Sequence, residues 1–253
     1  MRALKVLRQL AVAGIFQSRQ LLRTPFFVQQ AIAAPLSFAL LRALGSRGVG
    51  AEIPTQLWFD AAVAGMWATT TTAVGIIGFQ RFQGTLEHLA LSTLRPSVVF
   101  GSLCAAATVI GWIGIPISLA VQYFLTGSVV ITINAVIAFL FTALACLVSA
   151  FVLASLFILS RSATAYEPLI LAPIWLLTGI VIPLTAMPDW LQGVALFHPL
   201  TAAVNASRST TTSEFLMWLL VSLAVSAVWL VVAARLLRVA MRRARVLGTL
   251  GLA

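Results

Sequence analysis

The stretch that decides the fold is VVITINAVIAFLFTALACLVSAFVLASLFIL, residues 129–159, which contains no charged side chain. A membrane-spanning helix needs roughly 20 consecutive apolar residues, so this run is long enough to cross a bilayer. Across the chain of 253 residues, apolar residues make up 61% and charged residues only 9%. A water-soluble domain with this composition could not cover its surface with polar groups. The sequence therefore predicts an integral membrane protein.

Five further apolar runs extend this pattern and predict an all-α, polytopic fold with six transmembrane helices. We place the spans at about residues 25–44, 57–79, 97–125, 129–159, 168–184 and 215–234. The third and fourth runs are longer than one bilayer crossing, and only Thr126-Gly127-Ser128 separates them. This spacing indicates a tight helical hairpin whose ends project into water or tilt.

The 16 Lys and Arg residues lie mainly at the ends of the apolar runs and give a net charge of +10. Cytoplasmic segments of membrane proteins are enriched in Lys and Arg. With both termini in the cytoplasm, the outer segments contain only Arg42, Arg47 and Arg208. The predicted topology is therefore N-in/C-in. Nucleic acid is not an expected partner, because the basic residues do not gather on one water-facing surface.

Both ends of the chain predict basic segments at the membrane surface. Residues 1–24 form an amphipathic pattern typical of an interfacial helix that lies among lipid headgroups. Its polar side is Arg2, Lys5, Arg8, Gln9, Arg19 and Gln20, and its apolar side is Leu4, Leu7, Leu10, Ile15, Leu21 and Leu22. The alternative is a first transmembrane helix that starts near residue 9. Residues 235–253 predict a basic cytoplasmic tail with one stripe of Arg235, Arg238, Arg242 and Arg245. No cleaved signal peptide is expected, since the first apolar patch is short.

Two segments between spans contain most of the candidate functional residues. The cytoplasmic segment 80–96, QRFQGTLEHLALSTLRP, predicts either a short helix or a solvated loop, and Pro96 fits the start of the next helix. On the outer side, prolines interrupt the apolar sequence, so residues 185–213 are expected to dip into the outer leaflet as helical pieces and to cap the exit. Asp189 would lie near the positive N-terminal end of one piece.

These two segments carry a family resemblance. Residues 84–87 (GTLE) through Arg95-Pro96 resemble the cytoplasmic loop of ABC type-2 transporter permeases, and residues 183–191 (PLTAMPDWL) with 198–201 (HPLT) resemble that family's segment before the last helix. The six-span layout extends the resemblance to the whole chain. The sequence departs from the family's commonest pattern at Gln80 and Gln83, where relatives often have acidic residues.

The resemblance implies a permease subunit of an ATP-driven exporter in a bacterial cell membrane. Its cytoplasmic loop would contain a coupling helix that contacts a separate ATPase, which would bind ATP and Mg²⁺. The implied coupling residues are Gln80, Arg81, Gly84, Thr85, Glu87, His88 and Arg95. A second permease copy or a related permease would complete the pathway. The only lysine, Lys5, precedes Val6, so the chain has no P-loop lysine and is not expected to be an enzyme.

Other residues are weaker candidates. Polar side chains within the spans are candidates for the substrate pathway, although hydroxyls in membrane helices commonly bond to their own backbone; they are Gln29, Gln30, Thr69, Thr72 and Asn134. The outer-gate candidates are Pro183, Pro188, Asp189, Trp190 and His198. The scarcity of charge favours an amphiphilic or hydrophobic cargo such as an antibiotic, with lipid-linked polysaccharide as the alternative.

Two other classes of protein fit the sequence less well. A secondary transporter would mark its pathway with ionisable groups at membrane depth, whereas Asp60 and Glu167 are expected at the interfaces. An intramembrane enzyme would need a cluster such as Ser102 or Ser118 with His198, which no spacing supports. Cys104 and Cys146 lie inside apolar runs, so we expect neither a disulfide nor a metal site.

Overall fold

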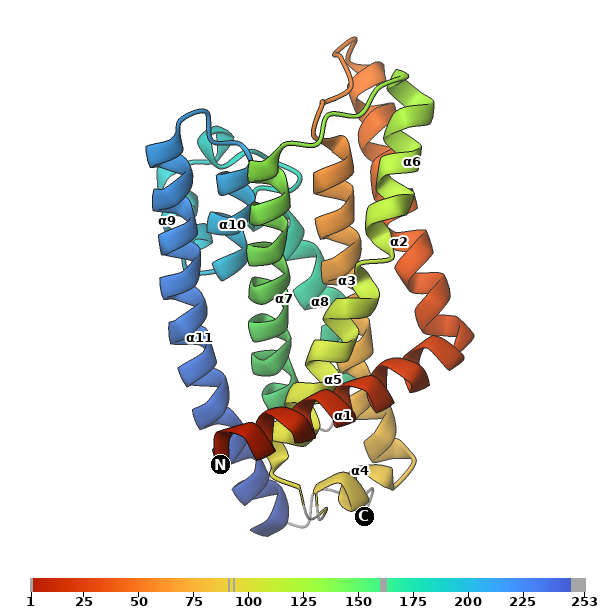
Figure 1. Ribbon diagram of the computed structural model, residues 1–253, viewed down its shortest axis with the longest axis vertical. Coiled ribbons are helices and arrows are strands. Elements are labelled where there is room, and N and C mark those ends of the chain that lie inside the picture. Colours follow the sequence, from red (N-terminus) through yellow and green to blue (C-terminus); the bar gives the residue numbers. More distant parts are fainter. Residues whose placement is uncertain (1, 91, 93, 160–162, 247–253) are drawn as a thin grey trace.

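The computed structural model describes residues 2–90, 92, 94–159 and 163–246, and this part of the chain is helical with no strand (Figure 1). The all-α prediction is confirmed for these residues. The helices in chain order are α1 (Arg2–Arg23), α2 (Pro25–Gly48), α3 (Leu57–Phe82), α4 (Thr85–Ala90), α5 (Pro96–Gly111), α6 (Gly114–Thr126), α7 (Ile133–Leu159), α8 (Ala163–Leu177), the 3₁₀ turn η1 (Leu184–Ala186), α9 (Asp189–Leu196), α10 (Pro199–Ser207) and α11 (Thr212–Val246).

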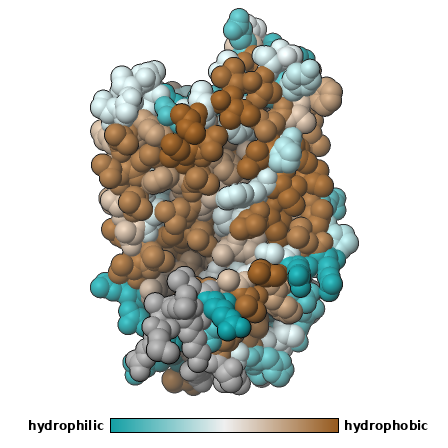
Figure 2. Space-filling model, in the orientation of Figure 1, coloured by the Kyte–Doolittle hydropathy of each residue, from teal (hydrophilic) through white to brown (hydrophobic). Residues whose placement is uncertain are grey.

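Five helical segments of the described chain are long and apolar enough to cross a membrane, one fewer than the six predicted. They are Pro25–Gly48, Leu57–Gly78, Pro96–Thr126, Ile133–Leu159 and Thr212–Ala244. The fifth predicted span, 168–184, corresponds to α8, which has 15 residues and contains Pro168 and Pro173. The helix ends before Gly179, whose φ of 85° is left-handed. Figure 2 shows the apolar band between two more polar ends.

The central helix of the bundle is α3. It packs against α2, α5, α6, α7 and α8. Within its apolar window 83% of the residues are buried, compared with 22% in α11 and 28% in α2. Close approach to α2 depends on Gly65, because a Cβ there would lie 2.6 Å from Pro35 Cδ. The faces that α2 and α11 leave exposed are available to lipid or to a partner chain.

The third predicted span is divided into two helices. α5 ends at Gly111 and α6 begins at Gly114, with Trp112 and Ile113 between them. Pro116 lies in the first turn of α6, where it cannot donate to Trp112 and its ring would clash with that carbonyl in a continuous helix. The hairpin turn that follows uses Gly127, which has a φ of 71°.

The first and last helices differ in how they relate to the bundle. α1 ends at Arg23, and α2 starts separately at Pro25, so the alternative of one transmembrane helix starting near residue 9 is wrong. α1 packs along α5 and crosses the bundle obliquely in Figure 1. Its outward face includes Val12, Ile15 and Phe16, which are all more than half exposed. α11 continues as one helix of 35 residues past the predicted end of the span, so Arg235, Arg238 and Arg242 extend from the membrane helix.

The two ends of the bundle contain different elements. α4, the first turns of α1 and the last turns of α11 lie at one end, while α9, α10 and the connection between α2 and α3 lie at the other (Figure 1). This arrangement agrees with the N-in/C-in topology, which stays a prediction because no membrane is part of the structure.

Candidate functional site

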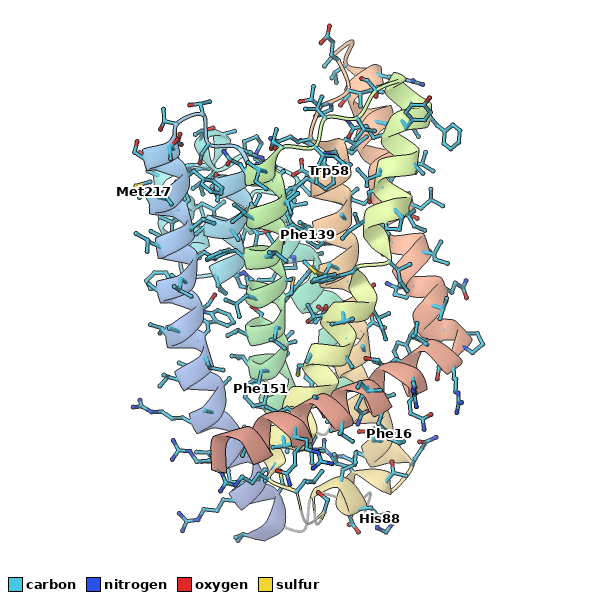
Figure 3. The ribbon with its side chains drawn as sticks, in the orientation of Figure 1. Phe16, Trp58, His88, Phe139, Phe151 and Met217 are labelled. Atoms are coloured by element: carbon cyan, nitrogen blue, oxygen red, sulfur yellow. The ribbon has the colours of Figure 1, made fainter. Side chains whose placement is uncertain are left out.

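The short helix α4 lies within the segment predicted to couple to an ATPase. Gly84, with a φ of 71°, makes the turn from α3 into α4. Thr85 Oγ donates to the Gln80 carbonyl at 3.1 Å, which ties the start of α4 to the end of α3. Leu86 is fully buried, whereas Glu87 and His88 are exposed. α4 therefore has a buried anchor on one side and a charged, accessible surface on the other, and Figure 3 shows His88 at that end of the molecule.

Arg81 occupies a different environment from the other candidate coupling residues. Its side chain is buried, and Nη2 donates to the Ile158 carbonyl in the last turn of α7. A guanidinium is stabilised near the negative end of a helix. Arg81 therefore links α3 to α7 and does not belong to the exposed surface, unlike Arg95, which is exposed at the start of α5.

A cavity of about 550 Å³ lies between the start of α2, the inner half of α3 and the beginning of α4. Thr72 and Gln80 both line it, together with Thr85. The buried Gln80 Oε1 has no hydrogen-bond partner among the described residues. The structure thus brings one predicted pathway residue beside two predicted coupling residues.

The other predicted pathway residues do not converge on this cavity. Gln29 is exposed on α2, Gln30 is half-buried, and Asn134 is half-buried in the first turn of α7 at the opposite end. Thr69 is buried, and its hydroxyl has no hydrogen-bond partner in the described part of the chain. Several other hydroxyls bond to their own helix, as Thr71 does to the Trp67 carbonyl at 2.8 Å.

The outer segment folds into the 3₁₀ turn η1 and two short helices, α9 at the surface and α10 inside the bundle. Pro183 immediately precedes η1 and Pro188 immediately precedes α9. Asp189 and Trp190 lie on the surface in the first turn of α9, with Trp190 72% exposed. α10 is almost entirely buried and packs between α7 and α11. The polypeptide therefore returns into the interior at α10 before it reaches α11.

His198 lies at the turn between α9 and α10 and is buried, and its role as an outer-gate residue stays a prediction. Its Nδ1 accepts a hydrogen bond from the Leu200 N–H at 3.3 Å and so caps α10. Because Nδ1 is an acceptor, Nε2 carries the proton and donates to Ser149 Oγ at 3.3 Å. The imidazole ring contacts Trp67 and Trp229 edge-on, with centroid distances of 5.6 and 5.0 Å.

This environment does not resemble a hydrolytic site. The serine that contacts His198 is Ser149, and not Ser102 or Ser118 as an intramembrane enzyme would have required. Ser102 Oγ donates to the Val99 carbonyl at 2.9 Å. Within the described ranges, no group of three His, Cys, Asp or Glu side chains could hold a metal ion, and Cys104 and Cys146 are buried and unbridged.

A polar network joins the outer ends of four elements. Asp60 of α3 is buried and accepts from Arg208 Nη2 at 2.9 Å, and Arg208 Nη1 also donates to the Gly179 carbonyl at 2.6 Å. Arg42 of α2 donates to the Val181 carbonyl. Asp60 lies in the first turn of α3, at the end of the span as predicted, but the expectation that water reaches it is wrong, because its side chain is buried. An acidic residue in the first turn of an apolar span is a signal that a cation lies nearby, but it does not identify which of the outer arginines is the partner.

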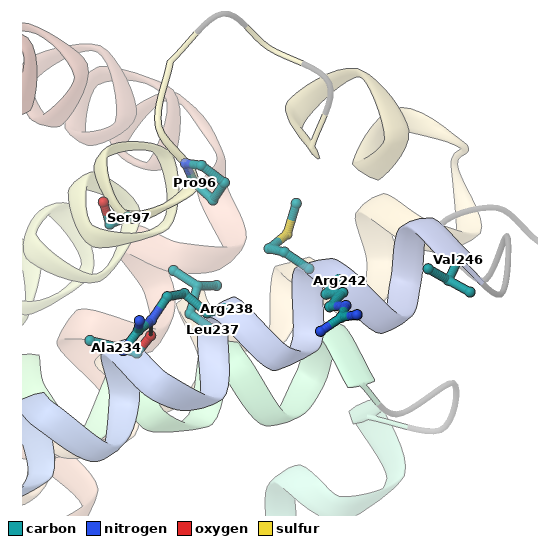
Figure 4. Close-up of a pocket in the computed structure, with 8 residues that line it drawn as sticks. Pro96, Ser97, Ala234, Leu237, Arg238, Arg242 and Val246 are labelled. Atoms are coloured by element: carbon teal, nitrogen blue, oxygen red, sulfur yellow. Dashed lines mark hydrogen bonds between the residues drawn. The ribbon is translucent and has the colours of Figure 1, made fainter.

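A groove of about 650 Å³ lies at the α4 end of the bundle, between the first turn of α5 and the last turns of α11. In Figure 4, Pro96 and Ser97 lie on one side of the groove, and Arg238 and Arg242 lie on the other. Its lining combines apolar side chains such as Leu237 and Met241 with these two arginines.

Comparison with known protein families gives one match. The family model of the ABC-2 type transporter matches residues 8–212 of the chain. The matched range begins within α1 and ends at the first residue of α11. A comparison with curated proteins found no match.

Proposed function

This chain belongs to the ABC-2 type transporter family and is a permease subunit of an ABC transporter, and we propose that it exports an amphiphilic or hydrophobic compound from the cytoplasm or the inner leaflet. The resemblance seen in the sequence is confirmed by the family match. Permeases of this family work with a separate ATPase, which would bind ATP and Mg²⁺.

The observation that carries the proposal is the structure of α4. Its buried Leu86 fixes the helix against the bundle, while Glu87 and His88 point to solvent. A helix anchored in this way would move together with α3 and α5. A conformational change in a bound ATPase would therefore displace these helices as well. Arg95 is exposed at the start of α5 and extends the same charged surface.

Hydrogen bonds provide a route from this surface to the outer segment. Arg81 connects α3 to the end of α7, and Ser149, farther along α7, bonds to His198 at the start of α10. Ser222 Oγ of α11 donates to the Pro199 carbonyl at 3.2 Å. A displacement of α3 would therefore reach α7 and α10 and would open the outer cap formed by residues 185–213.

The cavity beside α4 supports the choice of cargo. It is lined by Phe26, Phe27 and Ile76 together with neutral polar groups such as Thr72 and Gln80. This mixture suits an uncharged or amphiphilic compound that enters from the inner leaflet. An antibiotic or a lipid-like molecule fits this lining, and lipid-linked polysaccharide is the second candidate.

A dimer of permeases in a bacterial cell membrane is the proposed assembly. The mostly exposed faces of α2 and α11 support it, since they leave apolar area for a second copy or a related permease.

α1 would lie among the inner headgroups, with Arg8 and Arg19 exposed beside its apolar outer face.

The test replaces the two charges of the proposed docking surface in the double variant Glu87→Ala/Arg95→Ala. We expect the co-purified ATPase to remain bound and to hydrolyse ATP, while resistance of the host cells to a panel of amphiphilic antibiotics is lost. The matched control is Arg47→Ala/Glu52→Ala, which removes two exposed charges at the opposite end of the bundle. Full resistance in the Glu87/Arg95 variant would contradict the coupling role.

A further inference from the structure

We propose that the cavity between α2 and the end of α8 binds the anionic headgroup of an amphiphile, a phosphate or a carboxylate, through Arg42. The cavity has a volume of about 580 Å³ and lies at the end of the bundle opposite α4. It is separate from the inner cavity beside Thr72 and Gln80.

Arg42 has unused capacity to bind an anion. Its side chain is partly buried within the apolar segment Pro25–Gly48. One hydrogen bond is formed, from Nη1 to the Val181 carbonyl. Nε has no partner among the described residues, but it is buried, so an anion in the cavity would bind to the remaining Nη donors. A guanidinium carries five N–H donors in a fork that matches a carboxylate or a phosphate. A single carbonyl leaves most of this capacity unused.

The local charge balance also calls for an anion. The Asp60 carboxylate is paired with Arg208 at 2.9 Å. No carboxylate of the described side chains lies within ion-pair distance of Arg42. A charge held away from water is costly unless it is paired, so a second anion would stabilise this site.

The walls of the cavity indicate that the anion belongs to an amphiphile. Phe38, Leu41 and Trp175 line it beside Arg42. The rings of Phe38 and Trp175 pack at a centroid distance of 6.0 Å, and the Trp175 indole donates to the Ala64 carbonyl at 3.3 Å. The apolar wall is thus fixed in place next to a cation. An alkyl chain or a ring would contact this wall while its headgroup reached Arg42.

Gly45 keeps the cavity open and provides a way to fill it. It lines the cavity one turn from Arg42, and a Cβ at this position would meet no atom within 4 Å. A leucine at this position would occupy the cavity without displacing the backbone, and it would leave the guanidinium in place. Gly45→Leu therefore tests whether binding requires the volume of the cavity, and Arg42→Gln tests whether it requires the positive charge.

The experiment titrates dodecyl phosphate into the purified full-length chain, with its co-purified ATPase, in dodecyl maltoside, and measures binding by isothermal titration calorimetry. Loss of a charge-assisted hydrogen bond costs about 1.5–3 kcal/mol, so we expect Arg42→Gln to bind at least about tenfold more weakly. Gly45→Leu should lower the affinity for dodecyl phosphate by a similar factor, and Arg42→Lys should retain part of the natural affinity.

Matched controls lie on the same helix. Arg47→Gln removes an exposed arginine that does not line the cavity, and Gly48→Leu adds the same side chain outside it. Both should bind dodecyl phosphate as the natural chain does. Equal binding by Arg42→Gln and the natural chain would overturn the proposal, as would inorganic phosphate binding as tightly as dodecyl phosphate.

Two sources of the headgroup are distinguished by repeating the measurement with phosphatidylglycerol and by assaying ATP hydrolysis in phosphatidylcholine nanodiscs. Arg42-dependent binding of phosphatidylglycerol without a change in ATP hydrolysis assigns the site to a bilayer lipid. Arg42-dependent stimulation of hydrolysis by dodecyl phosphate assigns it to cargo, an assignment that rests on the proposed function. If no ATPase co-purifies, the proposed function fails, while the binding titrations still decide the anion site.

Discussion

Asp60 stabilises the fold through its ion pair with Arg208, because its carboxylate is shielded from water. Its side chain is buried and its ion pair measures 2.9 Å. Asp60→Asn keeps the shape but leaves the Arg208 charge without a counter-ion, so we expect a loss of about 3–5 kcal/mol in the free energy of unfolding, measured by titration with sodium dodecyl sulfate.

Asp189→Asn is the matched control, since that carboxylate is exposed at the start of α9. The double variant Asp60→Asn/Arg208→Gln should recover part of the loss, because the unpaired charge is gone. If Asp60→Asn were as stable as the control, the ion pair would have no structural role.

Gly65 is required by the contact between α2 and α3. The added methyl group of Gly65→Ala would lie 2.6 Å from a ring carbon of Pro35, and a proline ring has no flexible end that could move aside. We expect a lower thermal unfolding midpoint and a loss of about 1–3 kcal/mol in the free energy of unfolding. Gly14→Ala in α1 is the control, because no atom lies within 4 Å of its Cβ. Equal midpoints for the two variants would show that α2 can move away from α3 at little cost.

Single residues show where sequence reasoning is insufficient. The Asp60–Arg208 bond joins positions 148 apart, and the Ser149–His198 bond joins positions 49 apart. Nothing in the local sequence identifies such partners, because packing of distant helices brings them together. The exposure of Glu87 and the burial of Leu86, in contrast, agree with what their side chains alone indicate, since a carboxylate favours water and a leucine favours the protein interior.

Helices were easier to predict than their interruptions. The apolar runs identified α2, α3, α7 and α11 because a bilayer crossing requires a minimum length. The break between α5 and α6 and the short α8 were missed, although Pro116 marks the first place and Gly179 follows the end of α8. Composition alone did not show that a proline divides one run while α8 continues through Pro168 and Pro173, since neighbouring helices in a membrane can compensate for a proline.

The return of α10 into the bundle depends on His198. His198→Ala removes the cap on Leu200 and the bond to Ser149, and it leaves space between Trp67 and Trp229. A large-to-small change in a packed interior costs about 2–5 kcal/mol. We expect faster proteolysis within residues 189–207 together with a lower unfolding midpoint.

Asparagine is a good N-cap residue, so His198→Asn should retain part of the protection. Ser149→Ala removes only one hydrogen bond and should cost about 1 kcal/mol. An alanine variant at position 198 with natural protease resistance would indicate that α10 is held by its apolar contacts alone.

The two ends of the molecule differ in their basic residues, and the orientation of these ends in a membrane is a prediction. Of the three basic residues predicted outside, Arg208 is paired with the Asp60 carboxylate, whereas Arg42 and Arg47 have no such partner among the described side chains. Two uncompensated arginines therefore remain at that end. The N-in/C-in topology stays a prediction from the distribution of Lys and Arg.

Cysteine labelling tests this orientation. The natural Cys104 and Cys146 are fully buried, so an added cysteine dominates the reaction with a maleimide. We expect Glu52→Cys to react with a membrane-impermeant maleimide in intact cells, and His88→Cys to react only after the membrane is opened. The reverse pattern would establish the opposite topology.

The central claim is that α4 contacts the ATPase subunit, and photo-crosslinking from position 88 tests it most directly. The variant His88→Cys would be labelled with a benzophenone maleimide in native membranes, irradiated and analysed by mass spectrometry, with Glu52→Cys as the control at the other end. The account predicts a cross-link from position 88 to a protein with a P-loop and none from position 52. A chain that purifies with no ATPase and forms no such cross-link would contradict it.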